Sequence, residues 1–129
     1  MNKYIATVCF FIKDKSVLLV EAEYPDGHRV WNGIGGKVDE NETPIQGLLR
    51  EIDEETKLQV LERDIVKVDV VTEGNFELHV FITHEWSGEM VMIDPTIKQF
   101  KWFTFEGVPY EQMHKGNDKW LPNILLQQT

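Results

Sequence analysis

The sequence predicts an α/β protein in which helices cover a mixed β-sheet. Runs of β-branched and aromatic residues, typical of strands, precede, separate and follow two segments with helical periodicity, and the first of these helices has clear start signals. The chain has 129 residues, of which 42% are hydrophobic, so we expect one domain over residues 1–129 with a substantial core.

The first two strands are expected near the amino terminus. Lys3–Lys13 carries apolar side chains on both faces, which is typical of a strand in the centre of a sheet. A two-residue turn at 14–15 leads into a second strand at Ser16–Ala22, which pairs back onto the first. A polar loop follows at Tyr24–Arg29.

The next element is a helix with recognisable ends. Thr43 is a good N-cap, Pro44 suits the first helical position, and Gln46 completes a capping box with Thr43. One apolar stripe follows at helical spacing: Ile45, Leu48, Leu49 and Ile52. We expect the helix to end at Lys57 or Leu58.

Three more strands and a closing helix complete the predicted fold. The strands are expected at Ile65–Thr72, Phe76–Glu85 and Gln99–Phe105. In the second of them the inward side chains are expected to be Phe76, Leu78, Val80 and Ile82. The closing helix is expected at Asp118–Gln128, with Trp120, Ile124 and Leu125 at least partly buried.

Charge and cysteine content exclude several classes of function. The net charge of −9 argues against binding to nucleic-acid polymers or anionic membranes, although an anionic ligand would bind if metal cations first neutralise the acids. The apolar run Ile5–Ile12 is too short to span a bilayer and is a poor signal peptide. Cys9, the single cysteine, lies in this run and is interpreted as a buried, inert thiol in a reducing compartment. We therefore expect a soluble cytoplasmic protein.

Acidic residues are concentrated on the predicted helix. At about 100° per residue, Glu51, Glu54 and Glu55 occupy one sector beside the apolar stripe, where three carboxylates can converge on a hard divalent cation. The alternative is a solvated helix face with surplus charge. The pair Gly35-Gly36 favours the metal site, because glycine lets the backbone approach a ligand closely.

Glu42 and Arg50 form a second candidate pair, eight residues apart. The guanidinium group stays charged and its planar fork can hold a carboxylate through two hydrogen bonds. We assign this pair to bracing the loop against the helix.

The spacing of these residues resembles the Nudix box, G-x5-E-x7-R-E-U-x-E-E-x-G-U, where U is a bulky aliphatic residue. Gly36, Glu42 and Arg50 match, and the run Glu51 to Glu55 continues the match. The one departure is Lys57, which stands where the box has glycine. This departure affects the geometry at the end of the helix and removes no metal ligand.

The resemblance implies the Nudix fold, an α/β/α sandwich, and hydrolysis, dependent on Mg²⁺ or Mn²⁺, of a nucleoside diphosphate linked to another group. Carried over by position, the metal ligands are Glu51, Glu54 and Glu55, with the Gly35 carbonyl as a further ligand. Glu54 is expected to be the most critical carboxylate for catalysis and Glu51 the next, with Arg50 and Glu42 supporting them. Lys37 contacts phosphate or is an ordinary surface lysine.

Flanking segments resemble the MutT-type 8-oxo-dGTP diphosphatases of the same family. They are Trp31–Val38, Glu77–Phe81, Trp102-Phe103 and Trp120–Gln127. This resemblance implies cleavage of oxidised purine nucleoside triphosphates to the monophosphate and pyrophosphate. It also implies that Asn32 hydrogen-bonds the purine, because an amide both donates and accepts; the alternative is an asparagine that caps its own turn.

Two departures bear on the substrate. The segment before the last helix, His114–Asn117, lacks the tryptophan and one aspartate that the animal enzymes carry there. Asn117 or Asp118 would then read the base, unless Asp118 serves only as the N-cap of the last helix. Ile97 occupies the place of an acid that those relatives carry near the Trp-Phe pair. Asp94 is the nearest acid, and the sequence leaves open whether it takes part as the last metal ligand or base.

The histidines and two of the tryptophans are interpreted as having no role in metal binding or catalysis. The four histidines, His28, His79, His84 and His114, show no metal-ligand spacing. Trp31 and Trp120 are assigned to packing, with base stacking as the alternative. The functional alternatives that remain are a Nudix hydrolase for a pyrimidine triphosphate or a nucleotide sugar, and a Nudix module that senses a nucleotide without cleaving it. The sequence leaves monomer and dimer open.

Overall fold

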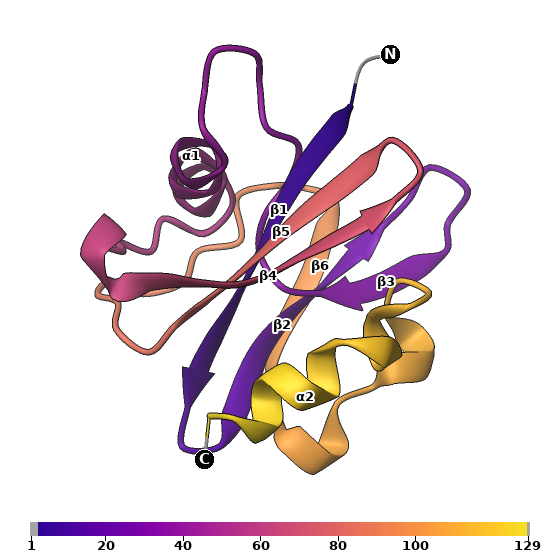
Figure 1. The fold of residues 1–129 in the computed structure, drawn as a ribbon. Helices are drawn as coiled ribbons and strands as arrows, with labels where there is room; N and C mark the ends of the chain where they lie inside the picture. The colour runs from indigo at the N-terminus through magenta and orange to yellow at the C-terminus, as the bar shows by residue number, and fades with distance from the viewer. Residues whose placement is uncertain (1–2, 129) are drawn as a thin grey trace.

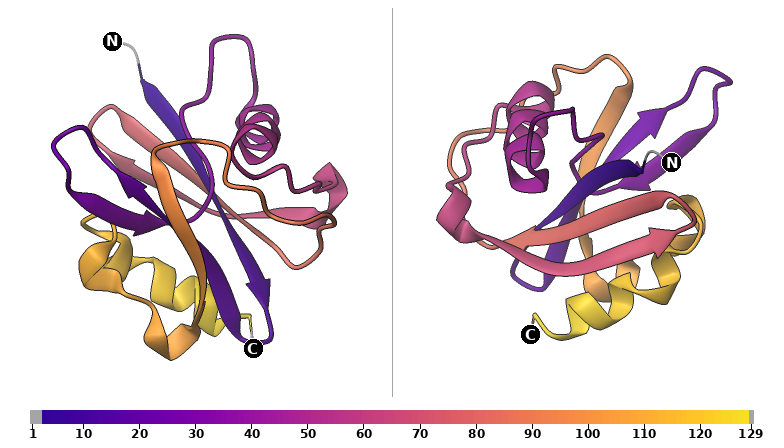
Figure 2. Two further views of the ribbon diagram at one scale, coloured as in Figure 1. Left: turned by 180° about the vertical axis from the view of Figure 1, so that it is seen from behind. Right: turned by 45° about the horizontal axis from the view of Figure 1, so that its top comes forward.

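The computed structural model describes residues 3–128, and within this range six strands form one mixed sheet. The strands are β1 (Tyr4–Lys13), β2 (Ser16–Glu23), β3 (Arg29–Asn32), β4 (Ile65–Glu73), β5 (Phe76–Thr83) and β6 (Ile97–Thr104), and the α-helices are α1 (Pro44–Thr56) and α2 (Leu121–Leu126). The strand order is β3-β2-β1-β5-β4, and β6 pairs with β2. Helices α1 and α2 cover opposite faces of the sheet, as predicted (Figures 1 and 2).

Strand β1 is central, as its two apolar faces predicted. It runs parallel to β5 and antiparallel to β2. Alternate side chains enter two cores: Phe10 belongs to the cluster that includes Leu121 of α2, and Phe11 to the cluster that includes Leu48 of α1. Cys9 is fully buried and burial raises the pKa of its thiol, so the interpretation as an inert core residue is confirmed.

Helix α1 begins and ends where its signals predicted. The Thr43 hydroxyl accepts from the Gln46 N–H at 3.3 Å, and the Gln46 side chain accepts from the Thr43 N–H at 2.9 Å. Lys57 ends the helix in the left-handed region, at φ 60°. This is the geometry that glycine adopts most easily, so the position that departs from the box still makes the expected turn.

Strand β3 was not predicted. It pairs antiparallel with β2, with Trp31 opposite Glu21 and Asn32 opposite Val20. Its four residues are too few to show an alternating pattern, and pairing with β2 decides their conformation. Trp31 is buried against Phe103, with ring centres 5.0 Å apart, which confirms its assignment to packing.

The prediction of one continuous closing helix is wrong. Residues Asn117–Lys119 form a 3₁₀ turn, and α2 covers only Leu121–Leu126. Pro122 explains the later start, because proline belongs in the first turn of a helix. The N-cap positions of the two elements are Gly116 and Trp120, so Asp118 is not an N-cap.

Phe76 also departs from the prediction. It is exposed at the beginning of β5, whereas Val80 and Ile82 of the same face are buried as expected. Phe81 is buried on the opposite face, so the second half of β5 is apolar on both sides. No helix among residues 3–128 is long and apolar enough to cross a membrane.

Candidate active site

Arg50 holds the acidic segment together. Its guanidinium group donates to both oxygens of Glu42, at 2.7 Å from Nη2 and 3.2 Å from Nε. Nη1 donates to Glu51 at 2.9 Å and lies 3.4 Å from Glu54. Nη2 also donates to the Lys37 carbonyl at 3.1 Å, which ties the preceding loop to α1. The predicted brace between Glu42 and Arg50 is therefore confirmed, and the hydrogen bonds from Arg50 lower the pKa of Glu42.

The two glycines of the loop are required for different reasons. A Cβ at Gly35 would lie 2.1 Å from the carbonyl oxygen of Thr7, so this loop runs directly against β1. A Cβ at Gly36 would lie 2.8–2.9 Å from the carboxylate of Glu51. The Gly36 carbonyl accepts from the Thr7 N–H at 2.9 Å, whereas the Gly35 carbonyl accepts no backbone hydrogen bond from residues 3–128. The Gly35 oxygen is therefore free to act as a ligand.

Glu55 is the carboxylate whose environment most favours a cation. Its Oε2 atom is buried and has no hydrogen-bond partner within the described residues. Burial, together with the charges of Glu51 and Asp94, raises the pKa of Glu55 to about 8, and a hydrogen bond from the Gly35 backbone opposes the rise. Burial also raises the pKa of Glu51, although Arg50 opposes that shift. A divalent cation would relieve this stored repulsion, so the donor set fits Mg²⁺ or Mn²⁺.

The carboxylates are not gathered into a closed cage. Among residues 3–128, no three or more side chains of His, Cys, Asp or Glu are already arranged as a metal site. Arg50 accounts for this, because it binds Glu51 and Glu54 directly. Such an open arrangement suits Mg²⁺, which usually takes one or two carboxylates and completes its coordination with water and phosphate oxygens.

Tertiary structure also brings an acid from outside the box to this face. The loop before β6 runs along the end of α1, where the Val91 N–H donates to the Thr56 carbonyl at 2.8 Å and the Ile93 N–H to the Glu55 carbonyl at 3.4 Å. This contact places the negative charge of Asp94 close enough to raise the pKa of Glu55. The sequence had left open whether Asp94 takes part in the site, and its contact with this face was not predictable from spacing.

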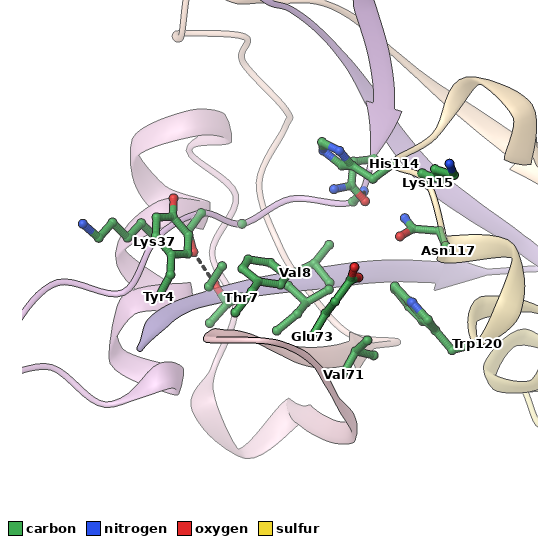
Figure 3. Close-up of a pocket in the computed structure, with 18 of the residues that line it drawn as sticks. Tyr4, Thr7, Val8, Lys37, Val71, Glu73, His114, Lys115, Asn117 and Trp120 are labelled. Carbon is green, nitrogen blue, oxygen red and sulfur yellow. Dashed lines mark hydrogen bonds between the residues drawn. The ribbon is translucent and has the colours of Figure 1, made fainter. Parts of the chain in front are cut away.

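A cleft of about 820 Å³ adjoins the glycine loop (Figure 3). The cleft is lined by three of the four candidate substrate contacts: Asn32, Lys37 and Asn117. The fourth, Asp118, is exposed and does not line it. Gly35 and Gly36 also line the cleft, so the cleft and the acidic side of α1 meet at this loop.

The asparagines present polar groups to the cleft. Asn32 accepts from the Gly33 N–H at 2.8 Å, so the turn-capping alternative is correct for its oxygen, while its amide nitrogen has no hydrogen-bond partner among residues 3–128. Asn117 is buried at 5% exposure and lines the cleft. Lys37 is exposed, and its ammonium group lies 5.3 Å from the centre of the Tyr4 ring.

Several cleft residues escaped sequence reasoning. His114 was set aside with the other histidines, yet it lines the cleft, and its Nε2 lies 3.3 Å from the Tyr24 hydroxyl. Burial, together with the charge of His28, lowers the pKa of His114. Trp120 lines the cleft as well as packing 6.2 Å from Phe10.

These contacts escaped detection because they join residues up to 90 positions apart, and no local pattern marks them. The only available signal was the departure at His114–Asn117. It flagged the segment as unusual without showing what the segment contacts.

Comparison with known proteins decides the family. The model of the NUDIX domain matches residues 2–124. This chain belongs to the Nudix family. The Nudix chain is 30% identical over 125 residues to the oxidized purine nucleoside triphosphate hydrolase of Danio rerio, an alignment that covers 94% of this chain and 79% of the relative. It is 36% identical over 64 residues to the 8-oxo-dGTP diphosphatase of Proteus vulgaris, covering 46% and 55%.

A solved structure confirms the Nudix fold. The MutT NUDIX hydrolase from Burkholderia pseudomallei superposes with a TM-score of 0.79 at 23% identity, over 100% of this chain and 99% of that one. The resemblance to Nudix hydrolases inferred from the box is therefore confirmed, and the protein is a Nudix hydrolase.

Proposed function

We propose that this Nudix hydrolase cleaves oxidised or otherwise noncanonical purine nucleoside triphosphates, such as 8-oxo-dGTP, to the monophosphate and pyrophosphate. The observation that carries the proposal is the buried, unpartnered oxygen of Glu55 beside Glu51, next to a cleft large enough for a nucleotide. The name of the Danio rerio relative supports an oxidised purine as the substrate.

The acidic side of α1 would hold the metal. Glu51, Glu54 and Glu55 are the proposed ligands, with the Gly35 carbonyl beside them, and Mg²⁺ is the expected ion with Mn²⁺ as a substitute. Such an ion, when bound, neutralises phosphate charge and lowers the pKa of a bound water. Glu54 is proposed as the carboxylate most critical to the reaction because it is the most exposed of the three, with 57% of its side chain accessible to a water and a phosphate.

The remaining residues would orient the nucleotide. Arg50 and Glu42 keep the carboxylates and the loop in register through the hydrogen bonds described above. Lys37 would contact phosphate, and Asn32 and Asn117 would contact the base; all three line the cleft, which supports these roles. We retain Asp118 only as a residue next to this segment, since it does not line the cleft.

A second candidate is hydrolysis of another nucleotide, a pyrimidine triphosphate or a nucleotide sugar. The observation that favours it is the cleft segment His114–Asn117, which differs from the animal 8-oxo-dGTP enzymes at the base-reading positions. A module that binds a nucleotide without cleaving it is disfavoured, because every carboxylate of the box is present.

The deciding experiment offers Mg²⁺ and a panel of canonical, oxidised and methylated nucleoside triphosphates, and resolves pyrophosphate from phosphate. We expect pyrophosphate release, strongest with 8-oxo-dGTP and abolished in Glu54→Gln. Faster turnover of a pyrimidine triphosphate would reassign the substrate and keep the carboxylate chemistry. Absence of turnover with any triphosphate would leave nucleotide sugars, tested in the same assay, or the sensing module.

A further inference from the structure

Glu73 is a cleft residue that neither the box nor the fold accounts for. It is the last residue of β4, and it lines the cleft together with Asn117 and Trp120. Figure 3 shows its carboxylate pointing away from the strand into the space bordered by those two side chains. The side chain is exposed and forms no hydrogen bond or ion pair with any residue from 3 to 128.

The isolation of Glu73 contrasts with the other strand carboxylates. Glu21 and Glu23 lie 3.5 and 3.4 Å from Arg29, and Glu77 accepts a hydrogen bond from Nε2 of His79 at 2.8 Å. Lys115 and Lys119 line the same cleft, yet neither forms an ion pair with Glu73 within the described residues. The carboxylate is therefore left free to contact a ligand.

A free carboxylate is an unexpected group in a cleft for a triphosphate. Electrostatically it repels the ligand, so a useful role needs specific hydrogen bonds that outweigh the repulsion. An ionised carboxylate only accepts hydrogen bonds, through two oxygens side by side. Its best partner is a planar edge with two adjacent N–H donors. Among purines, guanine and 8-oxoguanine present such an edge in N1–H and the 2-amino group, whereas hypoxanthine has only N1–H and adenine pairs a donor with an acceptor.

We propose that Glu73 selects guanine-type bases by accepting hydrogen bonds from N1–H and the 2-amino group. The opposite side of the cleft is complementary, because the free amide nitrogen of Asn32 can donate to a base oxygen. Glu73 thereby supplies a carboxylate to the base from β4, whereas the segment His114–Asn117 supplies none. This inference names the base class of the proposed function and rests on it for the hydrolytic reaction only, since base selection is also measurable by binding.

The test compares two nucleotides that differ only in the 2-amino group. Calorimetry measures binding of dGMP and dIMP to the wild type, to Glu73→Gln and to Glu62→Gln, a matched substitution of an exposed glutamate outside the cleft. We expect the wild type and Glu62→Gln to prefer dGMP by about tenfold, the scale of a hydrogen bond to a charged group. Glu73→Gln should bind both nucleotides alike. A shorter variant, Glu73→Asp, should retain part of the preference.

Three outcomes would overturn the inference. They are an equal affinity of the wild type for dGMP and dIMP, no binding of either, and a Glu73→Gln variant that binds both more tightly by the same factor. The last would show that Glu73 acts through charge alone. Thermal melting of each variant excludes unfolding as the cause of a loss.

Hydrolysis of dGTP and dITP separates this inference from the proposed function. Binding that depends on Glu73 without hydrolysis of either triphosphate would uphold base selection and refute the triphosphatase. Hydrolysis with a ratio of kcat/KM that Glu73→Gln leaves unchanged would uphold the triphosphatase and refute base selection.

Discussion

The acidic side of α1 and the cleft beside it differ in whether their carboxylates are paired with other side chains. Arg50 is hydrogen-bonded to Glu42 and Glu51 and lies within 3.4 Å of Glu54, so the acidic segment is braced before any ligand arrives. In the cleft, Glu73 has no partner among residues 3–128. Under the proposed function, the first region would carry the chemistry, whereas the second would select the substrate.

The largest expected effect is a loss of activity on substitution in the acidic side of α1. Glu54→Gln should lower kcat on the order of 10³-fold with little change in KM, because the amide removes the charge that would hold the metal. Steady-state kinetics with Mg²⁺ measures it. Since the side chain is 57% exposed, the melting temperature should stay the same. A loss of less than tenfold would show that Glu54 is not the critical carboxylate.

Substitutions of Gly35 and Gly36, two neighbours in one loop, are expected to affect different properties of the protein. Gly36→Ala should cost about 10²-fold in kcat, because its Cβ displaces the Glu51 carboxylate, the far end of a flexible side chain. Gly35→Ala should instead lower stability by about 3 kcal/mol or more, since its Cβ meets the backbone oxygen of Thr7. Denaturant unfolding and activity, measured on both variants, separate the effects. Equal unfolding midpoints would contradict this assignment.

Arg50→Lys tests the brace itself. A lysine ammonium cannot hold Glu42 through two hydrogen bonds and reach Glu51 as well, so affinity for Mn²⁺ should fall about tenfold. Titration of the protein with Mn²⁺ gives the affinity. Arg63→Lys, at an exposed position in the 3₁₀ turn Glu62–Asp64, is the matched control and should bind as the wild type does.

A substitution in the cleft is expected to change activity less. Asn117→Ala should raise KM about tenfold and lower kcat less, because it removes the proposed base contact and leaves the carboxylates in place. Steady-state kinetics with 8-oxo-dGTP measures the change. A fall in kcat as large as that of Glu54→Gln would erase the distinction between the two regions.

The last expected effect is on stability and depends on pH. The folded-state pKa of Glu55, about 8, lies above the ordinary glutamate pKa of 4.5, so the protonated form is favoured in the metal-free protein. Its contribution to stability is therefore complete below about pH 4.5, declines by up to about 1.4 kcal/mol per pH unit, and is lost above pH 8. Unfolding of wild type and Glu55→Gln from pH 5 to 9 gives the difference. A difference that does not change with pH would contradict the shift.

Much of the fold follows from local patterns. The capping box at Thr43 and the apolar stripe predicted α1 because both depend on residues within one or two turns. The apolar faces of β1 likewise predicted its central place. Strand β3 and the break at Trp120 were missed, since one depends on pairing with β2 and the other on a proline that overrides helical periodicity.

By itself, the sequence determined the acidic side of α1: the helix, the sector of its carboxylates and the brace to Glu42 all follow from spacing along one helix and its entry loop. Only the tertiary structure decided the cleft. Strand register and loop packing place Asp94 near Glu55, His114 beside Tyr24, and Glu73 in the same cavity as Asn117. Helical spacing repeats every few residues and is visible in sequence, whereas contacts between distant segments exist only once the sheet has formed.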